Sequence, residues 1–303
     1  MGYNYLKTFN KMQEIENSKI EKNITQSESL KVPPSEGFRE AFTLHLADTN
    51  LILAQRNAEW CGHGPILEQD IAITNISLDL LGQSRNFYQY AAQLINKRIK
   101  SAESEAPPLE VPEREGTKFE GEATEDSLAY LRTEREFKNC LLVEQPNGDW
   151  GQTVLRQFFF SAYQFLLYEK LQHSNDEQIA AIAAKALKEV TYHLRWSSEW
   201  VIRLGDGTDE SHQRMLHAID ELWRYTGELF IAADYETTAG FDVSILKDSW
   251  MKKVTAVFDE ATLPIPEKVF MQTGGKTGTH TEHFGFILSE LQYLQRTYPN
   301  VEW

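Results

Sequence analysis

Side chains that could bind a pair of metal ions inside a helical protein occur at four positions: Glu59, Asp79, Glu189 and His193. Helical bundles that activate oxygen collect carboxylates and Glu-x-x-His pairs from facing helices, because side chains three or four residues apart point into the same core. In this chain the frame that ends at His193 has Val190 where the carboxylate belongs. No set of the usual form is intact, so these four residues are a candidate only for an unusual di-metal centre.

Two shorter patterns place histidine near other reactive groups. One glycine separates Cys61 from His63, a spacing that suits a metal pair or a nucleophile with its base. Structural zinc needs four ligands, and no further pair accompanies these two, so we interpret the segment as a helix-ending turn. His280 and His283 could share one side of a helix, but their favoured roles are capping and packing at its start.

The segment 274–279 contains Gly275-Lys276-Thr277, which resembles the end of a phosphate-binding loop. Phe270 stands where the first glycine of such a loop would be, and no strand precedes it, so phosphate binding is not expected. We interpret the segment as a flexible loop in which Lys276 could contact an acidic partner.

Apolar residues recur at helical spacing along most of the chain, and no sustained period-two alternation indicates a sheet. The predicted fold class is therefore all-α. Glycine and proline mark the breaks between helices. The expected helices cover residues 38–60, 66–97, 126–145, 150–171, 176–204, 209–236, 243–258 and 280–298.

Composition predicts one folded domain with two polar additions. Residues 37–303 are expected to form a single helical domain, and residues 1–36, which end near Pro33-Pro34, a mobile N-terminal extension. The acidic segment 101–126 contains three prolines and is predicted to be a surface loop, because its like charges repel and proline excludes a regular helix.

The 303-residue chain has a formal net charge of −15, which repels phosphate backbones and anionic lipid headgroups. We therefore expect neither nucleic acid nor a membrane as a partner. Its apolar runs are too short to span a bilayer, and its first residues lack the apolar core of a secretory signal. With only Cys61 and Cys140, no disulfide framework is possible, so we expect a cytoplasmic protein.

Several long sequence motifs follow one another between residues 38 and 303. They are Ala58-Glu59-Trp60-Cys61-Gly62-His63, Leu78-Asp79-Leu80-Leu81-Gly82-Gln83, Leu142-Val143-Glu144-Gln145-Pro146-Asn147-Gly148-Asp149, Tyr192-His193-Leu194-Arg195, Arg203-Leu204-Gly205-Asp206-Gly207-Thr208 and His280-Thr281-Glu282-His283. Together they resemble the C-type structural subunit of the bacterial phenylacetyl-CoA epoxidase. Several long motifs in order are more specific than one short motif.

The resemblance implies a ferritin-like bundle with additional C-terminal helices. It also implies a non-catalytic subunit of a multicomponent monooxygenase, which epoxidises the aromatic ring of phenylacetyl-CoA with O₂ and NADPH during aerobic phenylacetate degradation. The implied partners are a related A-type catalytic subunit that holds the di-iron centre and, indirectly, a reductase. This chain would carry no cofactor and no catalytic residue of its own.

The resemblance further implies where metal ligands would lie in the catalytic relative. Where that relative reads D-E-x-G-H, this chain has Leu80 and Gln83 in place of the glutamate and the histidine. Where it reads K-E-E-x-x-H, the second glutamate is replaced by Val190, and only His193 keeps a ligating side chain. Iron needs anionic carboxylates, which leucine and valine cannot supply, so no metal is expected here.

The two remaining ligand positions are assigned by register. On the helix 150–171 the carboxylate position falls on Ser161, and on the first helix Gln55 is the expected equivalent, with Glu59 as the fallback. Two alternatives stay open at this point. The chain could be a di-metal oxygenase or oxidase with its own centre, or a helical scaffold unrelated to oxygenases.

Overall fold

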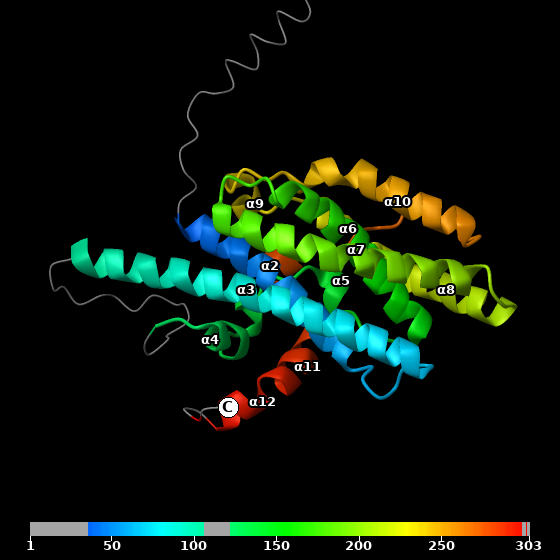
Figure 1. Ribbon diagram of the computed structural model, residues 1–303, viewed down its shortest axis with the longest axis horizontal. Coiled ribbons are helices and arrows are strands. Elements are labelled where there is room, and N and C mark those ends of the chain that lie inside the picture. The colour runs from blue at the N-terminus through cyan, green and yellow to red at the C-terminus, as the bar shows by residue number, and fades with distance from the viewer. Residues whose placement is uncertain (1–35, 106–121, 299–300, 302–303) are drawn as a thin grey trace, which may run out of the picture. The chain divides into compact units, whose positions relative to one another are not determined.

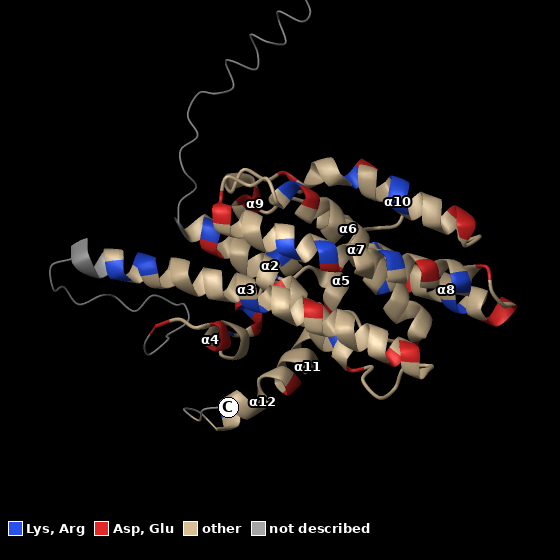
Figure 2. Ribbon diagram, in the orientation of Figure 1, with Lys and Arg blue, Asp and Glu red and all other residues tan. Residues whose placement is uncertain are grey.

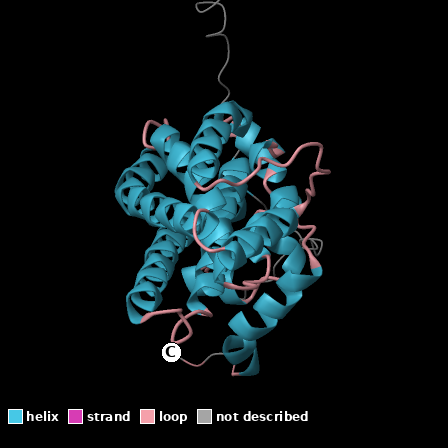
Figure 3. Ribbon diagram, turned by 90° about the vertical axis from the view of Figure 1, so that its right-hand side faces the viewer, coloured by secondary structure: helices cyan, strands magenta, loops and turns pink. Residues whose placement is uncertain are grey.

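The computed structural model describes residues 36–105, 122–298 and 301. Over these ranges the chain consists of helices and loops without a strand, as Figure 3 shows, and the all-α prediction is confirmed. None of the helices in these ranges is long and apolar enough to cross a membrane. The predicted N-terminal extension up to residue 35, and residues 106–121 of the predicted acidic loop, lie outside the described part of the chain.

Four long helices build the bundle, and they are paired in sequence order. α2 packs along α3, α6 packs along α7, and α3 also contacts α7, so the two helix pairs enclose a shared interior (Figure 1). Short connections within each pair make its helices antiparallel, which is the arrangement expected for a ferritin-like bundle. The four helices are α2 (Glu36–Ala58), α3 (Leu67–Glu105), α6 (Trp150–Leu171) and α7 (Glu177–Gly205).

The limits of α6 and α7 follow from local sequence chemistry. The Asp149 carboxylate accepts a hydrogen bond from Gln152 N, and the Asp176 carboxylate accepts from two backbone N–H groups at the start of α7. These side chains satisfy backbone donors that a helix start leaves unpaired. Most residues of α6 are buried, because α7, α8 and α10 pack around it. The helices predicted at 150–171 and 176–204 are confirmed to within one residue.

Shorter helices and 3-10 turns surround the bundle and confirm the expected additional C-terminal helices. Residues 35–303 form one compact unit, and the sequence placed the start of the domain at residue 37. The remaining helices are α4 (Glu125–Tyr130), α5 (Leu141–Glu144), α8 (Asp209–Leu222), α9 (Asp234–Thr238), α10 (Lys247–Glu260), α11 (Glu282–Leu291) and α12 (Tyr293–Thr297). The 3-10 turns are η1 (Glu134–Glu136), η2 (Trp223–Tyr225), η3 (Gly227–Phe230), η4 (Val243–Leu246) and η5 (Gly275–Thr277).

Three predicted boundaries are wrong. The stretch 126–145 is not one helix, because side chains from other elements bind its backbone N–H groups, as Asp48 binds that of Lys138. The helix predicted at 209–236 ends at Leu222 and continues as 3-10 turns. α3 runs to Glu105 and α4 begins at Glu125, so the segment predicted as the loop 101–126 is helical at both ends.

Candidate functional site

The six positions at which the resemblance implies metal ligands in the relative are distributed over all four long helices. Five of the six are almost completely buried: Leu80 and Gln83 on α3, Ser161 on α6, and Val190 and His193 on α7. Gln55 on α2 is only half-buried, and within the described ranges its side chain makes no hydrogen bond to the other five. The structure therefore places five of the six predicted positions in the interior of the bundle. The exception is Gln55, on the side formed by α2, which we call the α2 wall.

Amide side chains fill the middle of this interior. Gln83 Nε2 donates to Glu189 Oε2 at 2.9 Å, and Gln83 Oε1 accepts from Gln164 Nε2 at 3.1 Å. Gln164 Nε2 also lies 2.6 Å from Asn50 Oδ1, and Asn50 Nδ2 donates to the Tyr168 hydroxyl at 3.0 Å. Burial raises the pKa of Tyr168 to about 12, so this hydroxyl keeps its proton at neutral pH. These five residues, which we call the amide network, join α2, α3, α6 and α7.

A second set of buried amides joins only two of these helices, α2 and α6. Asn57 Nδ2 donates to Gln157 Oε1 at 2.8 Å, and Gln157 Nε2 donates to Ser161 Oγ at 2.8 Å. Asn50 and Asn57 are seven residues apart and share one face of α2. Asn50 and Asn57, and not Gln55, are the α2 amides that hydrogen-bond to α6 in the interior. Two asparagines at that spacing could have identified the interior face of α2 from the sequence, although asparagine is not a usual iron ligand.

His193 retains a carboxylate partner. Its Nε2 lies 3.0 Å from Asp79 Oδ2 across the α3 and α7 contact, and its side chain is fully buried whereas that of Asp79 is 37% exposed. Because a carboxylate only accepts, Nε2 donates, and Nδ1 has no hydrogen-bond partner among the described residues. Carboxylates orient metal-binding histidines in this way.

The donors around His193 nevertheless do not suit a pair of iron ions. Glu59, the fourth member of the alternative centre, lies beyond the end of α2 and contacts Arg56 and Asn147 at 3.0 and 2.7 Å. Leu80 and Val190 have no donor atoms for a metal. Within residues 36–105 and 122–298, no three histidine, cysteine, aspartate or glutamate side chains gather in a way that could hold a metal ion.

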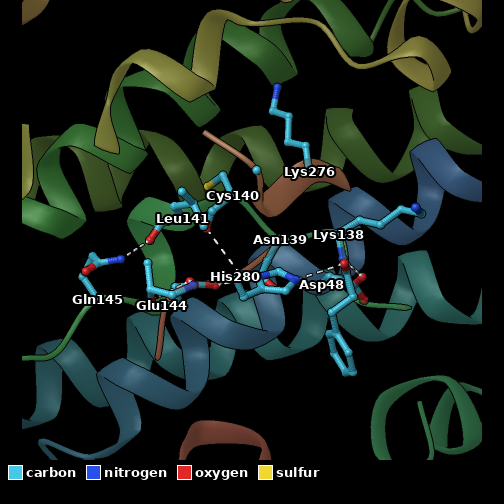
Figure 4. A network of polar contacts seen from close by, with 12 residues as sticks. Asp48, Lys138, Asn139, Cys140, Leu141, Glu144, Gln145, Lys276 and His280 are labelled. Atoms are coloured by element: carbon cyan, nitrogen blue, oxygen red, sulfur yellow. Dashed lines mark hydrogen bonds and ion pairs between the residues drawn. The ribbon is translucent and has the colours of Figure 1, made fainter. Parts of the chain in front are cut away.

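A second buried polar region lies around residues 131–145, which we call the connecting segment (Figure 4). Asp48 of α2 is fully buried, and its carboxylate accepts hydrogen bonds from the Arg132 guanidinium and, at 2.8 Å, from Lys138 N. Tyr88 also donates to Asp48 at 2.5 Å, and burial together with the Asp48 charge raises its pKa. One aspartate thus binds a backbone N–H group and a side chain of the connecting segment.

Glu144 performs the same role farther along the connecting segment. It accepts hydrogen bonds from Asn139 Nδ2 at 2.9 Å and from Thr281 N at 2.6 Å. His280 Nδ1 lies 2.8 Å from Glu144, while His280 Nε2 donates to Phe137 O at 3.1 Å. Burial lowers the pKa of His280, but the hydrogen bond and charge of Glu144 outweigh it, so the pKa lies above its ordinary value. Both ring nitrogens of His280 face acceptors, and this geometry favours the protonated imidazolium.

The interpretation of Lys276 as a contact for an acidic partner is wrong. Its Nζ is buried, lies 3.0 Å from Glu236 Oε2 and donates to Ile231 O at 3.1 Å. The loop 274–279 is not loosely placed either, since a Cβ added to Gly275 would lie 2.4 Å from Asn139 O. Glycine permits this close backbone approach, which carries the lysine into the interior where a carboxylate compensates its charge.

His45 is another buried polar side chain of α2. Its Nδ1 donates to Lys138 O at 2.7 Å, and its Nε2 lies 3.7 Å from Glu236 Oε1. Burial is the largest effect on this residue and lowers the pKa of His45. The lowered pKa favours the neutral imidazole, and the Lys276 ammonium group, 3.0 Å from Glu236, pairs with that carboxylate instead.

The Cys61 segment is the turn that the sequence predicted. Gly62 has a φ of 81°, a left-handed conformation that favours glycine, and the Cys61 side chain is exposed. Gly64 N donates to Asp70 Oδ2 at 3.0 Å, which ties the turn to the first turn of α3. Cys61 and His63 are not hydrogen-bonded to each other through their side chains in this part of the structure.

Comparison with known proteins agrees with the resemblance seen in the sequence. The family model described as phenylacetic acid catabolic protein matches residues 36–303. A curated relative, the C-type subunit of 1,2-phenylacetyl-CoA epoxidase from Escherichia coli (strain K12), is 47% identical over 268 residues, which cover 87% of this chain and 98% of the relative. The family match includes the four long helices and the connecting segment. The chain therefore belongs to the family of phenylacetic acid catabolic proteins.

Proposed function

We propose that this chain is a non-catalytic structural subunit of a multicomponent di-iron monooxygenase that epoxidises the aromatic ring of phenylacetyl-CoA. One observation carries the proposal: amides and apolar side chains occupy the interior where the iron ligands of a catalytic relative would lie. Such residues cannot offset the charge of two iron ions in a dry bundle. The similarity to a subunit of the Escherichia coli epoxidase supports the choice of substrate and complex.

The proposed partner is a related catalytic subunit that holds the di-iron centre, with electrons arriving from a separate reductase. A subunit without chemistry of its own affects turnover only through a lasting contact, and such contacts bury at least about 1,000 Å². We place the complex in the cytoplasm. This chain, when isolated, is expected to turn over no substrate.

The amide network gives the interior a structural role in this proposal. Each hydrogen bond between neutral amides stabilises a fold by only about 0.5–1.5 kcal/mol, but buried amides left unpaired cost more. The network therefore fixes the register of the four helices, in the place where a catalytic relative would use metal bonds. A fixed helix register would give the catalytic subunit a structurally invariant surface to bind.

Metal analysis tests the proposal directly. Purified alone after growth in iron-rich medium, the chain should contain far less than stoichiometric iron and show no absorption from an oxo-bridged iron pair. The alternative, a di-metal centre built on Glu59, Asp79, Glu189 and His193, has one supporting observation, the unpartnered Nδ1 of His193. Stoichiometric iron that is lost on His193→Ala, but kept in the control His283→Ala, would overturn the proposal in favour of that centre.

Reconstitution tests the assembly. Mixing this chain with the catalytic subunit and the reductase should restore epoxidation that the catalytic subunit and reductase do not sustain without it. A catalytic subunit that is fully active without this chain, and that does not co-purify with it from the host, would refute the structural role.

A further inference from the structure

An apolar stripe runs along the outer face of α3. Leu67, Ile71, Leu78 and Leu81 are 72%, 51%, 60% and 45% exposed, although leucine and isoleucine are usually buried. Their spacing follows the alternation of three and four residues by which one helix packs against another. No described element of this chain covers the stripe, and α3 lies on the near side of the bundle in Figure 1.

A glycine, Gly82, lies at the C-terminal end of this stripe, within the continuous helix α3. A Cβ added to Gly82 would meet no described atom within 4 Å, so nothing in the described part of the chain requires a glycine there. Glycine weakens the interior of a helix, and its use is explained where another backbone approaches closely. The space above Gly82 is therefore the second sign of an absent partner helix.

Charged side chains mark the two ends of the stripe. Glu68 lies in the first turn of α3, and Arg85 lies one turn beyond Gly82. The Arg85 side chain pairs with Glu125 of α4 at 3.4 Å and is still 67% exposed, so part of its guanidinium faces outward. Figure 2 shows acidic residues at the N-terminal end of α3 and basic residues towards its other end. A partner helix fits this face if it has an apolar seam, a basic residue beside Glu68 and an acidic residue beside Arg85.

We infer that this stripe is the docking face for the iron-bearing subunit, an inference that rests on the proposed function. A second copy of this chain could match the end charges only with Glu68 facing Arg85. That register sets Asn75 against Leu78 twice and leaves two amides unpaired in an apolar seam. It would also join two chains that each have a net charge of −15.

The position of the stripe connects docking to the interior. α3 presents Leu78 and Gly82 outward, while the neighbouring residues Asp79 and Gln83 contact His193 and Glu189 of α7. The partner therefore rests on the same helix that the amide network holds in place.

Gly82→Leu separates docking from folding. Leucine is a better helix former than glycine and meets open space, so the thermal unfolding midpoint of the isolated chain should stay the same or rise by about 1–3 °C. Affinity for the catalytic subunit, measured by calorimetry or interferometry, should fall at least about tenfold, because the side chain fills the space of the partner backbone. Gly37→Leu, at another helical glycine with open space, is the matched control and should leave affinity unchanged.

Leu78→Asp provides a second variant of the stripe. Placing a carboxylate in the centre of an apolar seam should weaken the complex at least about tenfold. Ile245→Asp, at an apolar side chain that is 59% exposed on η4, should not weaken it. Circular dichroism of all four variants shows whether each remains folded.

The outcomes distinguish this inference from the function on which it rests. If the wild-type chain binds the catalytic subunit and both stripe variants bind equally well, the docking face is elsewhere and the proposed function stands. If the wild-type chain does not bind, the proposed function fails. If light scattering finds that the stripe variants lose only self-association, a second copy covers the stripe and the inference is wrong.

Discussion

The interior of the four-helix bundle and the connecting segment bury polar groups in opposite ways. The amide network contains mostly neutral groups, and its one acid, Glu189, lies at its edge. The connecting segment is held by fully buried carboxylates, Asp48 and Glu144, each paired with a cation. Both regions belong to one compact unit and lie against the same helix, α2.

This difference shows what each region must accomplish. Helices satisfy their own backbone, so the bundle interior needs only side chains that fill space and pair with one another. An irregular segment has N–H groups without partners, and carboxylates can accept several of them at once. Buried charge in this chain therefore occurs where backbone has to be fixed, and is sparse where iron would have required it.

The largest expected effect is the loss of Asp48. Asp48→Ala leaves the Arg132 guanidinium buried without its carboxylate and Lys138 N without an acceptor. Breaking a buried ion pair in this way costs about 3–5 kcal/mol, measured as the free energy of unfolding in urea. Glu210→Ala, which removes an exposed pair with Arg214, should have little effect. Similar values for the two variants would contradict the role assigned to buried charge.

Removal of an amide from the bundle interior should cost less. Gln83→Ala deprives Glu189 and Gln164 of a partner, and unpaired polar groups of this kind cost about 1–3 kcal/mol. The urea midpoint of this variant should lie between those of wild type and Asp48→Ala. A loss greater than that of Asp48→Ala would reverse the comparison between the two regions.

The pH dependence of stability should report on His280. Its pKa is raised in the folded chain, so its contribution is fully present below its ordinary pKa of 6.5 and is lost as the pH rises through the higher folded value. Wild type should therefore lose more unfolding free energy than His280→Asn when the pH rises from about 6 to about 9. Parallel pH profiles would show that His280 is not charged in the fold.

The smallest expected effect concerns the α2 wall. Gln55 is half-buried outside the amide network, so Gln55→Ala should change the unfolding free energy by no more than about 0.5 kcal/mol. Asn50→Ala, which unpairs Gln164 and Tyr168, should cost clearly more. Equal losses of unfolding free energy in the two variants would show that Gln55 belongs to the interior, as expected for the ligand-equivalent position on α2.

Helix positions were predictable where periodicity and caps coincide. The helix at 150–171 begins after a capping Asp149 and has a continuous apolar sequence, so its bounds were readable. The connecting segment is predicted as part of one helix over 126–145, yet within it only Leu141–Glu144 is α-helical. Its backbone partners come from residues far away in the sequence, such as Glu228, and no local pattern reveals them.

The site was only partly predictable for a related reason. Leu80, Gln83 and Val190 are recognisable in the sequence from the motifs around them, and all three lie in the interior. Asn50 and Gln164 belong to no ligand motif, and the sequence predicts an exposed Lys276 because lysine is rarely buried. Only the fold shows that a carboxylate, Glu236, lies beside that lysine.

The contact between Glu144 and Thr281 also has a consequence for biosynthesis. The two residues are 137 positions apart, and a ribosome adds about 5–20 residues per second, so roughly 7–27 seconds separate their synthesis. Throughout that interval the Glu144 carboxylate lacks the Thr281 N–H group and the His280 imidazole that pair with it in the finished fold. The helices up to Gly205 can pair as they emerge, but the Glu144 end of the connecting segment stays hydrated until His280 and Thr281 are made.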